Sequence, residues 1–208
     1  MRYEHKYVID HFHALEVQQL IRMHPAGFQK VYPDRLVNNL YFDTADFATF
    51  QHNLMGVSQR EKYRIRWYGV GEEAISNVRL ETKIKDNLLG RKIWTSAEVN
   101  GWDGLLSMIP TLDWTRKLQL QPVLLNAYQR SYFGTFDQKF RITIDHQLQF
   151  GPFQVTQKKL MPPLAGKVIL ELKYDQQLAS ESDRITQYLP FRVDKHSKYV
   201  TGTSLIYH

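Results

Sequence analysis

The sequence predicts an α+β fold in which antiparallel strands close into a β-barrel, or tunnel, with a charged lumen and with helices packed outside. Strand-like runs outnumber helical ones, and most of them place basic residues on one face and apolar residues on the other. A single strand of this kind is typical of a solvent-facing sheet. Its repetition in at least six stretches favours a closed sheet that encloses the charged faces. Because unpaired charges in a confined space are costly, such a lining requires a polyanion.

The length of 208 residues is enough for one substantial core, so residues 1–208 are predicted to form a single domain. The sequence contains no apolar run of membrane-spanning length, and its first residues are charged where a secretory signal would be apolar, so we expect a cytoplasmic protein. The absence of cysteine leaves oxygen or imidazole to hold any metal. The net charge of +6 favours an anionic partner, which could be nucleic acid, phospholipid, nucleotide or phosphate.

The first elements follow from hydrophobic periodicity and from helix caps. In chain order we predict a strand over residues 2–10, a helix over 11–22, a turn-rich connection over 30–35, a strand over 36–42, and a helix from Phe47 that ends before Gly56. The sequence Asp43-Thr44-Ala45-Asp46 is expected to cap this second helix, since these side chains accept hydrogen bonds from exposed amides.

The next elements are separated by glycine, proline and asparagine. We predict strands over 58–68, 76–85 and 90–96, with turns at Gly69-Val70-Gly71 and at Asp86-Asn87 with Gly90, and short helices over 102–120 broken at Pro110. Further strands are predicted over 123–133, 139–150 and 153–159, followed by a linker at 161–164 and a strand over 168–174. The chain then continues with a helix over 178–189 and with a terminal helix, or a turn followed by a helix, over 194–207. Lys195 and Lys198 are expected one turn apart on that last segment.

The stretch Val168 to Tyr174 shows the pattern most clearly. Residues two apart in a strand share a face, so Glu171 and Lys173 lie opposite Leu170 and Leu172. The same rule places basic side chains on one face of at least five further strands. The charged faces carry Lys6 beside Glu4; Arg64 and Arg66; Glu81 and Lys83; Lys92; Arg130 beside Tyr128; and Arg141.

Eight short motifs carry a family resemblance. They are Arg-Tyr-Glu-His-Lys-Tyr at the start, Asn-Leu-Tyr-Phe-Asp-Thr at 39–44, Tyr-Arg-Ile-Arg-Trp-Tyr-Gly at 63–69, Leu-Glu-Thr-Lys at 80–83, Tyr-Gln-Arg at 128–130, Arg-Ile-Thr-Ile-Asp at 141–145, Leu-Glu-Leu-Lys at 170–173 and Ser-Lys-Tyr at 197–199. In this order they resemble the catalytic domain of the vacuolar transporter chaperone (VTC) polyphosphate polymerases, a branch of the triphosphate tunnel metalloenzymes. No single motif is specific, but the resemblance covers essentially the whole chain.

The resemblance implies roles for individual residues. The residues that match basic tunnel positions are Lys6, Arg64, Arg66, Lys83, Lys92, Arg130, Arg141, Lys195 and Lys198; Tyr128 matches a tunnel tyrosine and Glu171 a metal-binding glutamate. We therefore predict that Lys6, Arg64, Arg66, Lys83, Arg130, Arg141 and Lys198 are catalytic and that Glu171 binds Mn²⁺ or Mg²⁺. The strand faces add Glu4, Glu81 and Lys173 to Lys92, Tyr128 and Lys195 as substrate-binding residues.

Phosphoryl transfer requires mainly positioning and charge neutralisation, which basic side chains and a divalent cation supply. The hypothesis is that the triphosphate of ATP lies along the basic lumen and that its γ-phosphoryl passes to phosphate or to a growing polyphosphate. One alternative is a triphosphatase, although the relatives that hydrolyse open with Glu-x-Glu-x-Lys, whereas this chain reads Glu4-His5-Lys6-Tyr7-Val8. Another alternative is a noncatalytic sensor of polyphosphate or nucleotides.

Two other functions are disfavoured. Nucleic-acid binding by stacking needs aromatic and basic residues on one face, whereas Ile65 and Trp67 alternate with Arg64 and Arg66. No Gly-x-x-x-x-Gly-Lys-Ser/Thr motif of a P-loop enzyme is present in the sequence.

Overall fold

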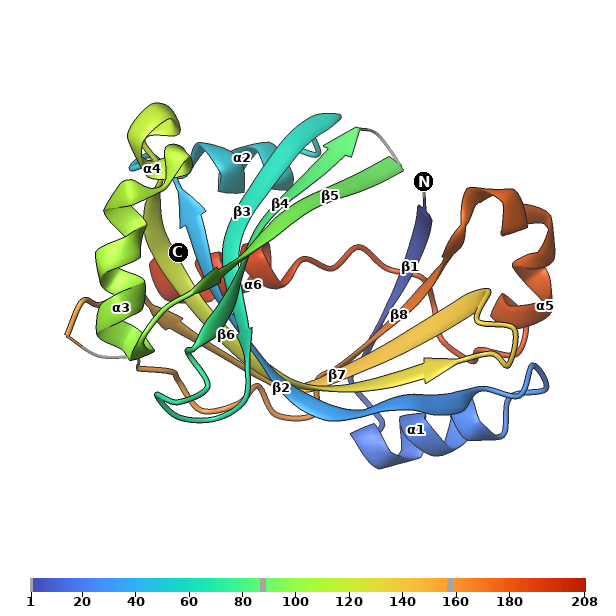
Figure 1. Ribbon diagram of the computed structural model, residues 1–208. Helices are drawn as coiled ribbons and strands as arrows, with labels where there is room; N and C mark the ends of the chain where they lie inside the picture. The colour runs from blue at the N-terminus through green and yellow to red at the C-terminus, as the bar shows by residue number, and fades with distance from the viewer. Residues whose placement is uncertain (1, 87–88, 157–158) are drawn as a thin grey trace. The chain divides into compact units, whose positions relative to one another are not determined.

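The computed structural model describes residues 2–86, 89–156 and 159–208. The elements, labelled in Figure 1 where there is room, are β1 (Arg2–Ile9), α1 (Ala14–Arg22), β2 (Gln29–Asp43), α2 (Ala48–Leu54), β3 (Gln59–Tyr68), β4 (Asn77–Asp86), β5 (Leu89–Glu98), α3 (Gly101–Met108), the 3₁₀ turn η1 (Ile109–Thr111), α4 (Asp113–Leu118), β6 (Gln121–Gly134), β7 (Phe140–Pro152), β8 (Val168–Asp175), the 3₁₀ turn η2 (Gln176–Glu181), α5 (Asp183–Thr186) and α6 (Lys198–Tyr207).

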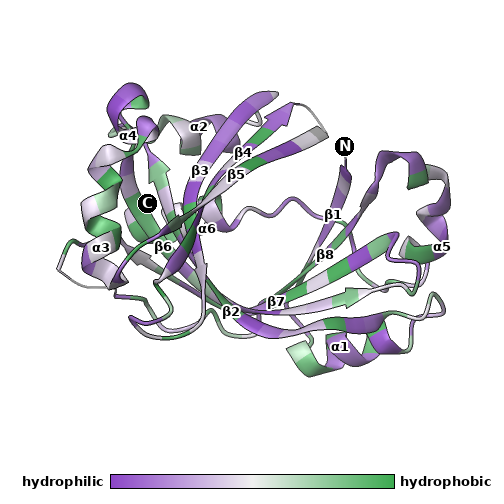
Figure 2. Ribbon diagram, viewed as in Figure 1, coloured by the Kyte–Doolittle hydropathy of each residue, from purple (hydrophilic) through white to green (hydrophobic). Residues whose placement is uncertain are grey.

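The strands form one sheet in the order β1-β5-β4-β3-β2-β6-β7-β8, which closes on itself. Neighbours such as β3 and β4, or β1 and β8, run antiparallel. Hydrophilic and hydrophobic residues alternate along strands such as β4 (Figure 2), as expected for a sheet with one apolar face. The predicted α+β class, a closed antiparallel sheet with helices outside, is confirmed.

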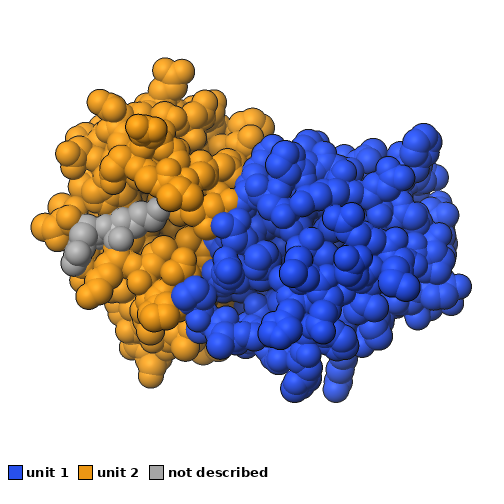
Figure 3. All heavy atoms as spheres, turned by 90° about the horizontal axis from the view of Figure 1, so that it is seen from below, with its two compact units in different colours: residues 1–35, 128–148, 163–196 blue, residues 36–127, 149–162, 197–208 orange. Residues whose placement is uncertain are grey.

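The chain divides into two compact units, shown in different colours in Figure 3. Unit 1 comprises residues 1–35, 128–148 and 163–196, and unit 2 comprises residues 36–127, 149–162 and 197–208. Each unit has its own hydrophobic core and is described by itself. The prediction of a single domain stays a prediction.

In each unit, helices cover the apolar strand face. In unit 1, Val17 and Ile21 of α1 join Leu170 and Leu172 of β8 in the buried core. In unit 2, the core includes Ile65 and Trp67 of β3 together with Trp102 and Leu105 of α3. Because side chains alternate along a strand, the charged residues of β3 and β8 lie on the face opposite these cores. This arrangement confirms the predicted separation of apolar and charged faces.

Two predicted connections differ in the structure. Residues 30–35 belong to strand β2 rather than to a turn-rich connection. These residues are mostly exposed and polar, so the sequence shows no apolar alternation there. Pro33 also favours a turn over a strand interior. Arg35 lies over the rings of Tyr32 and Tyr132, which stabilises the extended strand by cation-π contacts. The predicted turn at Asp86-Asn87 lies partly outside the described residues.

Three further predictions are wrong in part. No strand forms at 153–156 or at 159, and the rest of the range predicted as strand 153–159 lies outside the described residues. The predicted helix over 178–189 is the 3₁₀ turn η2 followed by the short helix α5. The terminal helix begins only at Lys198, where Ser197 caps it, so Lys195 lies before the helix rather than one turn from Lys198. None of the helices in the described ranges combines the length and the hydrophobicity of a membrane-spanning helix.

Asp43 is the buried acceptor that joins β2, α2 and α6 in unit 2. Its side chain is completely buried and accepts hydrogen bonds from the backbone amides of Thr49 at 2.8 Å and Phe50 at 2.9 Å. Tyr199 of α6 donates its hydroxyl to the same carboxylate. Burial, together with this hydrogen bond to Asp43, raises the pKa of Tyr199. The predicted cap at residues 43–46 therefore also anchors the C-terminal helix.

Replacing Asp43 by alanine is expected to lower the free energy of unfolding by about 3 kcal/mol. Loss of a helix cap costs about 1 to 2 kcal/mol, and the buried Tyr199 hydroxyl would lose its partner at a cost of about 1 to 3 kcal/mol. Urea unfolding monitored by circular dichroism measures this loss. The control Asp46→Asn changes an exposed carboxylate on the same loop and should cost less than about 1 kcal/mol. Equal losses in the two variants would refute the anchoring role.

Candidate functional site: two carboxylates among basic side chains

Glu171 is the centre of the charged face in unit 1. Strand pairing places it opposite Lys6 of β1 and opposite Thr143 of β7. Its Oε2 accepts a hydrogen bond from Lys173 Nζ at 2.7 Å and lies 3.7 Å from Arg130 Nη2, while its Oε1 lies 3.8 Å from Lys6 Nζ. One carboxylate thus faces three basic side chains, and only 8% of its side chain is exposed.

Arg130 is held in place by a second buried carboxylate. Its Nε and Nη2 donate to the two oxygens of Asp145 at 2.5 and 2.6 Å, and Asp145 is completely buried. Burial acts to lower the pKa of Arg130, but Asp145, Tyr128 and Glu171 outweigh it and raise the pKa well above the usual value. Arg130 also lies over the ring of Tyr128, with 5.2 Å between its Cζ and the ring centroid. The guanidinium is therefore a permanent, fixed cation beside Glu171.

The C-terminal segment before α6 lies along β1. Tyr7 of β1 forms an antiparallel bridge with Val193, and the backbone amide of Asp194 donates to the Lys6 carbonyl at 2.8 Å. Lys6 Nζ in turn donates to the His196 carbonyl at 2.7 Å. This contact fixes the ammonium of Lys6 on the Glu171 side of β1.

Two predicted residues at the rim of this cluster contact each other. Glu4 pairs with Lys173 in the β1–β8 register, and their charged groups are 3.6 Å apart. Lys173 therefore bridges Glu4 and Glu171, in agreement with its predicted place on the charged face. Arg141 pairs with Lys173 across β7 and β8 but is exposed, and no ion pair of Arg141 is found within the described ranges. Lys195 is likewise exposed, and its ammonium makes no ion pair in the described part of the chain.

Glu81 is the centre of a second cluster, in unit 2. It pairs with Arg64 in the β3–β4 register and accepts hydrogen bonds from Arg64 Nε at 2.8 Å and from Lys92 Nζ at 3.0 Å. Arg66 Nη1 lies 3.9 Å away. Burial would raise the pKa of Glu81, but the charges of Arg64, Arg66 and Lys92 outweigh burial and lower it to about 2. Glu81 is therefore ionised in the folded protein at neutral pH.

The low pKa of Glu81 predicts an acid-sensitive contribution to stability. Because the folded pKa is about 2 and the usual value is 4.5, this contribution is complete above pH 4.5 and is lost as the pH falls towards 2. The difference corresponds to roughly 3 kcal/mol. Urea unfolding at several pH values should therefore show a shallower acid-side loss for Glu81→Gln than for the wild type.

The control for that prediction is Glu98→Gln, which neutralises an exposed carboxylate on β5. Its stability curve should run parallel to that of the wild type between pH 5 and pH 2. If the stability curve of Glu81→Gln also ran parallel to that of the wild type, Glu81 would not make the expected charge interactions with Arg64, Arg66 and Lys92.

Arg66 is oriented by a chain of buried amides. Its Nε donates to Asn39 Oδ1 at 2.8 Å, and Asn39 Nδ2 donates to Asn126 Oδ1 at 3.1 Å. Asn126 Nδ2 then donates to the Gln149 carbonyl at 3.0 Å. Each donor finds an acceptor, so the guanidinium is held in one orientation beside Glu81.

Three lysines lie side by side across the same face. Lys62, Lys83 and Lys92 occupy paired positions on β3, β4 and β5. Like charges on opposite positions of neighbouring strands destabilise a sheet. Lys62 Nζ donates to Ser197 Oγ at 2.8 Å, which brings the N-terminus of α6 and the buried Lys198 to this side of the strands. A row of lysines with this cost favours binding of an anion.

The structure also brings in residues that the sequence analysis did not assign to the site, although most of them lie in the quoted motifs. Ser197, Asn39 and Asp145 orient basic residues through the contacts given above. Tyr41 accepts a hydrogen bond from Arg64 Nη1 at 3.3 Å, and Trp94 pairs with Glu81 across β4 and β5. Aromatic side chains therefore do share the charged face, contrary to the expectation from Ile65 and Trp67. Counting alternate positions on β2 and β5 would have found both residues.

The donor set near Glu171 determines what kind of metal site it can form. Among residues 2–86, 89–156 and 159–208, no group of three or more histidine, aspartate or glutamate side chains could hold a metal ion. Mg²⁺ is bound through one or two carboxylates together with water and substrate phosphate oxygens. Glu171 therefore fits a metal that arrives with a phosphate ligand, and it does not fit an all-protein metal cage.

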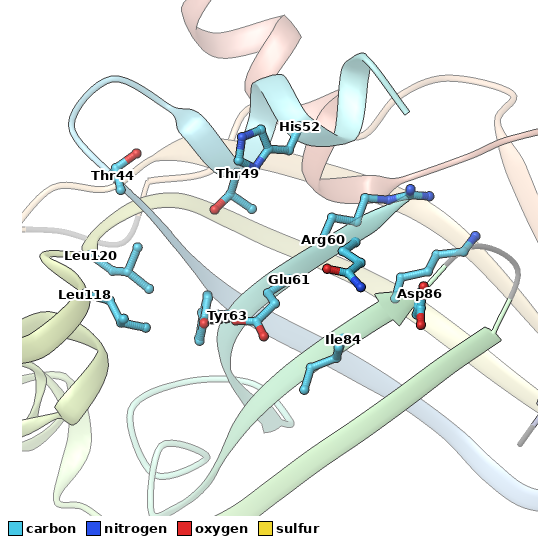
Figure 4. A pocket seen from close by; sticks show the side chains of 12 residues that line it. Thr44, Thr49, His52, Arg60, Glu61, Tyr63, Ile84, Asp86, Leu118 and Leu120 are labelled. Carbon is cyan, nitrogen blue, oxygen red and sulfur yellow. Dashed lines mark hydrogen bonds between the residues drawn. The ribbon is translucent and has the colours of Figure 1, made fainter. Parts of the chain in front are cut away.

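A pocket of about 510 Å³ in unit 2 is lined by residues that belong to neither cluster (Figure 4). Its wall includes Thr49 and His52 of α2, Tyr63 of β3 and Ile84 of β4. Tyr63 also belongs to the hydrophobic core of unit 2. None of the predicted site residues lines it, so we take the Glu171 cluster of unit 1 and the Glu81 cluster of unit 2, each by itself, as the candidate sites.

Comparisons with known proteins agree with this fold. The sequence profile of the VTC domain matches residues 1–112 and 107–207. Among solved structures, a proposed adenylate cyclase of Bacillus halodurans has a TM-score of 0.60 at 12% identity and covers 100% of this chain and 98% of its own. A proposed adenylyl cyclase of Hippeastrum with a dominant triphosphatase activity has a TM-score of 0.56 at 15% identity, with 99% and 97% covered.

A third structure, a proposed adenylate cyclase of Vibrio parahaemolyticus, has a TM-score of 0.55 at 12% identity and covers 96% of this chain and 97% of its own. At these identities the likeness concerns the fold alone. No curated protein matches the chain significantly in sequence.

Proposed function

Because the chain belongs to the VTC domain family, we propose that it is a metal-dependent phosphotransferase that acts on triphosphates and synthesises inorganic polyphosphate from ATP. The observation that carries this proposal is the pair of nearly buried carboxylates, Glu171 and Glu81, each among three basic side chains on a charged strand face. Around Glu81, one carboxylate among Arg64, Arg66 and Lys92 leaves an excess of positive charge, whereas around Glu171 the cations are also offset by Asp145 and Glu4. A polyanionic phosphate ligand would neutralise that excess.

The basic residues would bind and orient the phosphates. Arg64, Arg66 and Arg130 are fixed by hydrogen bonds to Glu81, Asn39 and Asp145, so each guanidinium would meet phosphate oxygens in a fixed orientation. Lysines such as Lys6 and Lys83 would act as point charges. Arg141 and Lys195, which are exposed, would contact the acceptor phosphate or the product rather than the bound triphosphate.

The divalent cation, Mn²⁺ or Mg²⁺, would be held by Glu171 and phosphate oxygens, and it would neutralise charge on the phosphoryl group when bound. The protein itself needs no nucleophile, because the terminal oxygen of phosphate or polyphosphate attacks the γ-phosphorus of ATP. The bond from that phosphorus to the β-γ bridging oxygen breaks, and ADP leaves.

Triphosphate hydrolysis is the second candidate function, favoured by the fold shared with the Hippeastrum protein. Water activation is helped by carboxylates that hold an additional metal or accept a proton. On β1, however, the residue that shares a face with Glu4 is Lys6, and Lys6 faces Glu171. A lysine at this position reduces the carboxylate count, which favours transfer to phosphate over hydrolysis.

Product analysis distinguishes these functions. Purified protein is incubated with ATP and Mn²⁺, and the products are examined on a gel stained for polyphosphate and by an assay for free phosphate. We expect long polymer and little free phosphate. Free phosphate alone would support the triphosphatase, and no turnover together with polyphosphate binding would support a sensor. The control Lys117→Ala, which removes an exposed charge on α4, should behave like the wild type.

A further inference from the structure

Trp94 shares the charged face of unit 2 although it is large and half-exposed. The β4–β5 register pairs it with Glu81, and paired residues on neighbouring strands project from the same face. The side chain is 52% exposed, whereas Trp67, on the core face of β3, is fully buried. Lys92 lies two residues before Trp94 on the same strand and donates to Glu81. An accessible indole therefore lies beside the cations of the Glu81 cluster.

Arg79 links this indole to a second aromatic ring. Its Cζ lies 5.0 Å from the ring centroid of Trp94 and 5.5 Å from that of Tyr68. No ion pair of Arg79 with a carboxylate is found in the part of the chain that the structure describes. Cation-π contacts with two rings hold the guanidinium in place while leaving its charge uncompensated. The result is a surface on which an aromatic face adjoins a positive charge.

We propose that Trp94, with Arg79, forms a stacking surface for the nucleobase of a nucleoside triphosphate whose phosphates bind the Glu81 cluster. This inference rests on the proposed function and assigns the site of the base. An exposed indole can stack on any base, since every base has a π-face. Arg79, which lies over Trp94 and Tyr68, is adjacent to the stacked base.

Binding of ATP and of inorganic tripolyphosphate tests the proposal, since only ATP carries a base. Titration calorimetry of the full chain gives the dissociation constant of each ligand. Trp94→Ala should raise the Kd of ATP about tenfold, within the range measured for loss of a stacking residue, and should leave the Kd of tripolyphosphate unchanged. Trp94→Phe keeps an aromatic face and should stay within about threefold of the wild type for both ligands. The control Ile93→Ala changes an equally exposed neighbour and should alter neither constant.

The proposal is overturned if Trp94→Ala weakens ATP and tripolyphosphate equally, or weakens neither. Selectivity is a second criterion: GTP should bind within a few fold of ATP, whereas a much tighter binding of ATP would indicate hydrogen-bonded base readout instead of stacking. Because these are binding measurements, they separate the two proposals. If ATP binding depended on Trp94 but no polymer were made, the proposed stacking site would be supported and the proposed polymerase activity would be wrong.

Discussion

Glu171→Gln is expected to abolish metal-dependent turnover, with a loss of at least about 100-fold. Loss of a residue that only supports a metal ligand costs about 10- to 100-fold, and Glu171 is the proposed ligand itself. Glutamine has the same shape but lacks the negative charge that faces Lys6, Arg130 and Lys173. Without metal, the same variant should bind tripolyphosphate at least as tightly as the wild type, since the three cations have lost their anionic neighbour.

Steady-state kinetics with varied Mn²⁺ and calorimetric binding without metal measure these two effects. A loss of turnover together with retained tripolyphosphate binding separates a metal-binding role from a structural one, because a misfolded variant would lose both turnover and binding. Glu181→Gln, which neutralises a partly exposed carboxylate in unit 1, is the matched control and should change neither turnover nor tripolyphosphate binding. Wild-type turnover in Glu171→Gln would remove this residue from the site.

Arg130→Met is expected to have the largest effect on stability, a loss of about 3 to 5 kcal/mol. The substitution leaves the completely buried Asp145 without its two charge-assisted hydrogen bonds, and an uncompensated buried charge is strongly destabilising. Turnover should also fall, since a fixed cation beside Glu171 is lost. Denaturant unfolding and product analysis measure the two effects.

The double variant Arg130→Met/Asp145→Leu separates stability from catalysis. Replacing both members of a buried ion pair by apolar residues is often neutral or stabilising, so most of the lost stability should return while turnover stays low. Arg141→Ala, unlike the single Arg130 variant, should leave stability unchanged because Arg141 is exposed. Recovery of turnover in the double variant would contradict the role of Arg130 in phosphate binding.

The sequence predicted the strands that carry the charged faces because alternation along them is nearly uninterrupted. For β8, the prediction that Glu171 lies opposite Leu170 and Leu172 is confirmed, since both leucines are in the core. The sequence did not predict the part of strand β2 before Leu36, because the exposed polar residues there and Pro33 do not show the apolar alternation of a strand. It also missed the non-helical backbone at Lys195, because no local signal there distinguishes an extended segment along β1 from a helix.

Within the site, alternation grouped residues by strand but could not supply the pairing between strands. The Lys6–Glu171 and Arg64–Glu81 contacts depend on register, which long-range packing sets. The partner of Arg130 is another example: Asp145 lies fifteen residues away on the next strand, so only the fold shows that the two form a buried pair. The position of Trp94 opposite Glu81 depends on register in the same way.

Phosphorus NMR of the reaction with ATP and Mg²⁺ tests the central claim most directly, because it follows the γ-phosphoryl group itself. The account predicts that the γ signal of ATP declines while the signal of internal polyphosphate phosphates grows, with about one polymer phosphate for each ADP formed. If the lost γ-phosphate appeared instead as orthophosphate, with no internal polyphosphate signal, the protein would be a hydrolase and the proposed transfer reaction would be wrong.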